Sequence, residues 1–110
     1  MSMTWDEAVA FALTLPGAEL ATSYGKPAVK VRGKGIMGVG REAGSFGVSA
    51  TLDEVEVLKE TDPDCFWQSP HYEGWPAILV REEAADRERV AALIERAWFH
   101  RASKTQRAMR

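Results

Sequence analysis

The fold of this chain is decided by residues 28–40, AVKVRGKGIMGVG, in which apolar and basic side chains alternate and glycine recurs. Val29 and Val31 fall on one face of an extended strand. Lys30 and Arg32 fall on the opposite face. The letters RGKG predict a hairpin turn that leads into a second strand, IMGV. The stretch therefore predicts antiparallel strands with one face in the core and one wet, basic face.

The same strand pattern extends to both sides of this stretch, over residues 18–50. Glycines punctuate short alternating segments, and after a turn at residues 42–44 the side chains of Phe46 and Val48 alternate with smaller residues. A later apolar run, residues 77–80, has the length of a strand and predicts an interior strand. We expect a meander of short antiparallel strands and one further strand.

Three segments carry helical signals. Thr4 stands three residues before Glu7, which is the spacing of a capping box, and Pro16 ends the apolar period that follows. The letters TLDE at residues 51–54 repeat the capping signal for a short second helix, and Asp86 begins a third. The predicted buried stripes are Trp5, Ala8, Val9, Ala12 and Leu13 in the first helix and Val90, Leu93, Ile94, Ala97 and Trp98 in the third.

This order of elements predicts an α+β fold in two layers. A mostly antiparallel sheet of about five strands would carry three helices on one face. The 110 residues suffice for a single domain with one core, which we place at residues 4–100. Residues 101–110 form a basic C-terminal tail, whose last letters, SKTQRAMR, are expected to fray.

Composition excludes several classes of protein. Apolar residues make up 45% of the chain and charged residues 27%, which is typical of a globular protein. No apolar run is long enough to cross a bilayer, and acids stand near the start, where a secretory signal would be basic. The single cysteine, Cys65, excludes an internal disulfide and a zinc site of paired cysteines. We expect a cytoplasmic protein with no membrane partner.

Four segments together resemble the MmcQ/YjbR family of small bacterial proteins. They are LPG at 15–17, TSYGKPAVKVRGK at 22–34, DPDCF at 62–66 and PHYEGWPAILV at 70–80. The most specific of them is PHYxG followed by an apolar strand. The resemblance implies a CyaY-like, that is frataxin-like, two-layer fold, and DNA binding through a proposed double-wing motif of strand hairpins. The letters GKGIMGVG are richer in glycine than the family pattern, which predicts a weaker strand in the wing.

Basic residues on and around the predicted hairpin suggest a nucleic-acid surface. The predicted phosphate contacts are Lys26, Lys30, Arg32, Lys34 and Arg41. About four or five such contacts predict weak, strongly salt-dependent and sequence-tolerant DNA binding. Further non-specific attraction would come from Arg101, Lys104 and Arg107. The alternative is an ordinary solvated strand face, because alternating lysine and valine is typical of any half-buried strand.

The segment QSPHYEGWPAILV, residues 68–80, supports a different kind of binding. His71, Tyr72 and Trp75 could stack on a base or on another flat ligand, which would make the chain a domain that binds a small molecule or a protein. The structural alternative is that the prolines and Gly74 build a turn and the aromatic rings cover the end of the core.

Two further chemistries find little support in the sequence. Cys65 and His71 are the residue types of a thiol nucleophile and its base, but their spacing does not guarantee contact and no third group is identified. A frataxin-like fold also suggests metal binding along an acidic helix, but the acids match no defined metal loop and carry no interleaved histidine. These acids are Glu54, Glu56, Glu60, Asp62 and Asp64. We therefore expect no enzyme activity, no metal and no cofactor.

Overall fold

The computed structural model describes residues 2–40 and 42–110. Its six strands form one antiparallel sheet with the order β1-β2-β3-β4-β6-β5. Along the chain the elements are α1 (Trp5–Ala12), β1 (Ala18–Ser23), β2 (Lys26–Val31), β3 (Lys34–Val39), β4 (Ser45–Ser49), α2 (Leu52–Thr61), β5 (Phe66–Trp67), β6 (Ala77–Arg81), the 3-10 turn η1 (Glu82–Ala84), α3 (Arg87–Arg101) and α4 (Lys104–Ala108).

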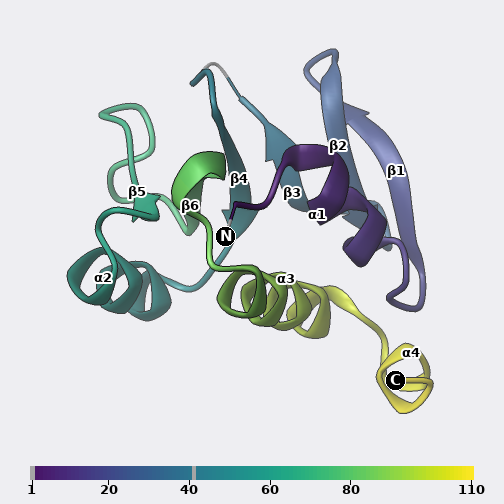
Figure 1. Ribbon diagram of the computed structural model, residues 1–110. Helices are drawn as coiled ribbons and strands as arrows, with labels where there is room; N and C mark the ends of the chain where they lie inside the picture. The colour runs from purple at the N-terminus through teal and green to yellow at the C-terminus, as the bar shows by residue number, and fades with distance from the viewer. Residues whose placement is uncertain (1, 41) are drawn as a thin grey trace.

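The elements form two layers, with α1, α2 and α3 on the same face of the sheet (Figure 1). The predicted α+β class with helices on one face is confirmed. The sheet has one strand more than expected, because the short β5 pairs with β6 at the edge. As predicted, β6 is an interior strand, lying between β4 and β5.

The helices begin where their caps predict. The hydroxyls of Thr4 and Thr51 form capping boxes at the starts of α1 and α2, and the Asp86 side chain accepts hydrogen bonds at the start of α3. The stripe of α3 is entirely buried. In α1 the predicted stripe is wrong at one position. Leu13 is 43% exposed, because the helix ends at Ala12 and Leu13 is its C-cap.

The C-terminal tail does not fray as expected. Ser103 and Gln106 form a capping box that begins α4, and the Arg110 side chain forms a salt bridge with Glu95, with Nε and Oε2 3.0 Å apart. The Gln106 side chain packs against the backbone at Gly17, where a Cβ atom would lie 2.1 Å from its Nε2. Local capping and these tertiary contacts together hold the segment.

Two hairpin turns have the same unusual composition. Tyr24 and Gly25 join β1 to β2 with φ of 53° and 77°, and Arg32 and Gly33 join β2 to β3 with φ of 54° and 78°. Two consecutive residues at positive φ make type I′ turns, which favour asparagine, aspartate or glycine at both positions. The hairpin predicted at RGKG is confirmed, but the placement of Arg32 on the strand face is wrong, because that residue is part of the turn.

A bulge interrupts the alternation of β3. Val29 pairs with Met37 but Lys30 pairs with Gly35, so Ile36 is an extra residue in β3. Both Ile36 and Met37 are buried in the core. Beyond the bulge, the face of β3 turned away from the helices carries Gly38.

Candidate functional site

The face of the sheet opposite the helices carries a groove floored by small residues. The strand register places Ala28, Gly38, Gly47 and Leu79 in one row across β2, β3, β4 and β6. Ala28 and Leu79 are buried, yet they are outside the core cluster that packs against the helices, which agrees with their position on the other face. Because glycine has no side chain, the two central strands leave a hollow, and the groove has a volume of about 670 Å³.

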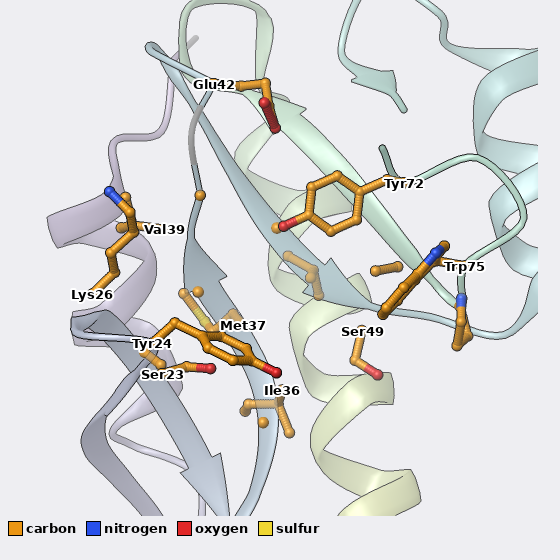
Figure 2. A pocket seen from close by; sticks show the side chains of 18 of the residues that line it. Ser23, Tyr24, Lys26, Ile36, Met37, Val39, Glu42, Ser49, Tyr72 and Trp75 are labelled. Atoms are coloured by element: carbon orange, nitrogen blue, oxygen red, sulfur yellow. The ribbon is translucent and has the colours of Figure 1, made fainter. Parts of the chain in front are cut away.

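Aromatic side chains stand on both sides of this groove, which we call the sheet-face groove. Tyr24, at the β1–β2 turn, and Lys26 lie on one side, while Tyr72 and Trp75 lie on the other (Figure 2). Tyr24 is fully exposed, with a relative exposure of 103%, and Trp75 is 56% exposed. Glu42 lies at the same end of the groove as Tyr72. A flat molecule lying on the glycine floor would therefore have aromatic rings on two sides.

The structure brings together the three aromatic residues that the sequence singled out. The rings of His71 and Trp75 are stacked, with centroids 6.0 Å apart and planes at 25°. The rings of His71 and Tyr72 meet edge to face at 5.2 Å. Backbone hydrogen bonds close the loop that carries them, from Tyr72 N to Ser69 O at 2.9 Å and from Trp75 N to Tyr72 O at 2.9 Å. These rings form one wall of the sheet-face groove.

The Gln68 side chain fixes this loop in place. Its Nε2 donates hydrogen bonds to the carbonyl oxygens of Trp75, at 3.1 Å, and Ala77, at 2.8 Å. Its Oε1 accepts a hydrogen bond from Lys59 Nζ at 3.1 Å. The sequence assigned no role to Gln68, since nothing in its neighbours shows that one side chain spans both ends of the loop. It is a positioning residue for the Trp75 side of the groove.

Replacing Gln68 by alanine is expected to lower the free energy of unfolding by about 1–2 kcal/mol, because two backbone acceptors lose a partly buried donor. Urea denaturation followed by circular dichroism measures the change. Glu73→Ala, in the same loop, is the control and should change stability by less than about 0.5 kcal/mol. Equal losses in the two variants would contradict the role given to Gln68.

Four of the five predicted phosphate contacts lie in the described part of the chain, spread along β2 and the turn that follows it. Lys26 and Lys30 share the outer face of β2, and Lys26 lines the sheet-face groove. Arg32 and Lys34 lie at the other end of β2, about 20 Å from Lys26 along the strand. Arg41 lies outside the described residues.

The cations predicted at the C-terminus also separate. Arg101 lines a second cavity together with Arg32 and Lys34. Lys104 begins α4, and Arg107 Nε donates a hydrogen bond to Phe99 O at 2.8 Å. Among the described residues, Lys26 thus lines the sheet-face groove, Arg32, Lys34 and Arg101 line the second cavity, and Lys30 lines neither.

The cysteine considered as a nucleophile lies in the core. Cys65 has no exposed surface, and burial raises the pKa of its thiol above the ordinary value. A higher pKa disfavours the thiolate that a nucleophile requires. His71, the base considered for it, stands at the sheet-face groove.

Some of the acids in and just after α2 pair with basic side chains. Arg96 Nε lies 2.7 Å from Glu54 Oε2, and Arg89 Nη1 lies 3.6 Å from Asp62 Oδ2. Burial would raise the pKa of Glu54, but hydrogen bonds from Thr51 and Arg96 lower it overall. Within residues 2–40 and 42–110, no group of three or more histidine, cysteine, aspartate and glutamate side chains is placed to hold a metal ion.

The fold defines a small α+β protein whose antiparallel sheet is covered by helices on one face and carries a groove on the other. Residues 13–100 match the family model described as YjbR, and the chain belongs to this family. No curated protein matches the chain. In the part of the chain that the structure describes, every helix is too short or too polar to span a membrane.

Proposed function

We propose that this chain is a non-enzymatic binding module that holds a flat heterocycle, of the size and polarity of a nucleobase, in the sheet-face groove. The observation that carries the proposal is a glycine floor between exposed aromatic side chains. A volume of about 670 Å³ lies within the usual range for small-molecule sites, roughly 300–1,000 Å³.

The lining of the groove suits a ring that is flat and polar at its edges. Stacking of a base on an aromatic side chain contributes about 1–3 kcal/mol, and rings are available on two sides. Lys26 and Glu42 bring one charge of each sign to the groove, together with the hydroxyl of Tyr72. This balance favours a neutral ligand with both donors and acceptors over a strongly charged one.

The backbone at Tyr24 supports a binding role for that residue. A bulky side chain at positive φ is strained, and such strain is common at functional sites. Asparagine would relieve the strain, and a fully exposed ring gives the fold no packing in return. Contact with a ligand would account for a tyrosine in this turn.

The test is a titration of the ¹⁵N-labelled protein with a set of flat heterocycles that includes adenosine and cytidine. Binding should shift the indole N–H signal of Trp75 and the amide signals of Tyr24 and Gly38. Tyr24→Asn is expected to weaken binding roughly tenfold while the melting temperature stays the same or rises. Phe99→Asn removes an exposed ring outside the groove and serves as the control. If no heterocycle gives saturable shifts at the groove, the proposal is wrong.

DNA binding, which the family resemblance implies, is a second candidate function. The observation in its favour is that Lys26 and Lys30 share the outer face of β2, while Arg32 and Lys34 stand at the end of that strand. Glu19 lies directly opposite Lys30 in the sheet, which reduces the local positive charge. A labelled duplex titrated at two salt concentrations tests this function. Binding that weakens with salt and is lost in Lys30→Glu would support it, and no binding at low salt would exclude it.

A further inference from the structure

A second cavity lies at the opposite end of β2 from the Tyr24 turn. It has a volume of about 160 Å³ and is lined by basic side chains from the β2–β3 turn and from the end of α3. We call it the basic cleft, and its lining residues are Arg32, Lys34, His100 and Arg101. Among the residues that the structure describes, no carboxylate lines it.

One of the residues that line the basic cleft, Arg101, has a side-chain donor with no partner within the described part of the chain. The Nε atom of Arg101 is buried and makes no hydrogen bond there. A buried donor without an acceptor is unfavourable, and more so when the group is charged. Arg32 and Lys34 add like charges to the same cavity. An oxyanion in the cleft would relieve this repulsion and accept hydrogen bonds from the guanidinium and ammonium groups that line it.

We propose that the basic cleft binds a terminal phosphate group, a site separate from the sheet-face groove. A terminal phosphate carries close to two negative charges near neutral pH, whereas a phosphodiester carries one, so a compact set of cations favours the terminal group. A guanidinium also matches the geometry of phosphate oxygens with paired N–H donors. The cleft is small, and the next cations along the strand, Lys30 and Lys26, are not part of it.

The β2–β3 turn places one of the guanidinium groups at the cleft at some cost to the fold. Arg32 has a φ of 54° at a position where asparagine or glycine is preferred. It is therefore a second residue that combines backbone strain with a place at a cavity, as Tyr24 does at the groove.

The C-terminal end of α3 repels an anion less strongly than a helix end with free carbonyl groups would. The last carbonyl groups of a helix carry partial negative charge. One of them, Phe99 O, accepts a hydrogen bond from Arg107 Nε at 2.8 Å, and the Arg107 guanidinium lies 4.2 Å from the centre of the Phe99 ring. The basic side chains of the cleft outweigh what remains of this field.

The experiment is a titration of the ¹⁵N-labelled protein with inorganic phosphate at constant ionic strength. We expect saturable shifts at the amides of residues 32–34 and 100–101. Arg32→Asn should weaken phosphate binding roughly tenfold without lowering the melting temperature in phosphate-free buffer. Lys26→Asn removes the same charge at the other end of β2 and should leave phosphate binding unchanged.

Two comparisons decide the chemistry of the anion. A phosphomonoester should bind as phosphate does, while a dinucleotide with a single phosphodiester should bind at least about tenfold more weakly. Equal affinity for the two would overturn the proposal of a terminal phosphate site in favour of a nucleic-acid contact. Absence of saturable shifts, or equal loss in Arg32→Asn and Lys26→Asn, would overturn the site itself.

Discussion

Replacing Gly38 by valine is expected to weaken ligand binding in the sheet-face groove by roughly a hundredfold or more, while the protein stays folded. Gly38 lies in the row that floors the groove, between Ala28 and Gly47. A Cβ atom there would meet the Cβ of Ala28 and the carbonyl oxygen of Pro27 at ordinary contact distances, 3.7 Å each. The branches of valine would therefore occupy the space in which the ligand ring lies.

The stability of the sheet should change little in this variant. Gly38 does not have a positive φ, so a side chain is compatible with its backbone, and β-branched residues suit a strand. The measurement is the ¹⁵N titration described above together with the melting temperature. Lys30→Val is the matched control, because Lys30 lies on the same face of the sheet but does not line the groove. Unchanged affinity in Gly38→Val would show that the ligand binds elsewhere.

The groove itself could not be predicted from alternation, although its glycines were visible in the sequence. The pattern GKGIMGVG predicted a weak strand, but the strand is paired on both sides and its glycines shape a surface. The reason is the bulge at Ile36, which lets two consecutive apolar side chains enter the core and places Gly38 on the outer face. A bulge depends on pairing with a neighbouring strand, so residues of one strand cannot reveal it.

In contrast, sequence signals that depend only on neighbouring residues, such as helix caps and turns, predict the structure correctly. The capping boxes at Thr4 and Thr51 and the turn at RGKG formed as predicted. Alternation alone puts Arg32 on the strand face, but the turn begins at that residue. The basic composition of the tail predicts fraying, whereas S-x-x-Q at residues 103–106 is a capping signal, and the tail forms a helix.

The sequence identifies one side of the sheet-face groove, the PHYEGW segment, but not the opposite side, where Tyr24 lies. The three aromatic residues of the PHYEGW segment were recognisable because they are adjacent. Tyr24 was missed, since its position opposite Trp75 depends on how β1 and β2 pair with the rest of the sheet. A signal for it does exist, because tyrosine followed by glycine is an unusual pair for a two-residue hairpin turn.

Replacing Trp98 by alanine is expected to have the largest effect on stability, lowering the free energy of unfolding by about 3–5 kcal/mol. Its side chain is only 1% exposed, among the largest in the core. Its Nε1 donates a hydrogen bond to Pro16 O at 2.7 Å, which ties α3 to the turn between α1 and β1. Because a domain has a total stability of about 5–15 kcal/mol, this variant would lie close to the limit of folding.

Two gentler variants separate the contributions of the Trp98 side chain. Trp98→Phe keeps an aromatic ring but leaves Pro16 O without its donor, so we expect a smaller loss, about 1–3 kcal/mol. Phe99→Ala, at a neighbouring residue that is 49% exposed, should lose about 1 kcal/mol or less. Urea denaturation measures the loss in free energy of unfolding for all three variants. Similar losses for Trp98→Ala and Phe99→Ala would contradict the role of Trp98 in the core.

Trp98 packs on the helix side of the sheet, so the Trp98→Phe variant should bind ligands in the sheet-face groove with unchanged affinity. Loss of binding in that folded variant would mean that the two layers are coupled and that the groove depends on the core as well as on its glycine floor.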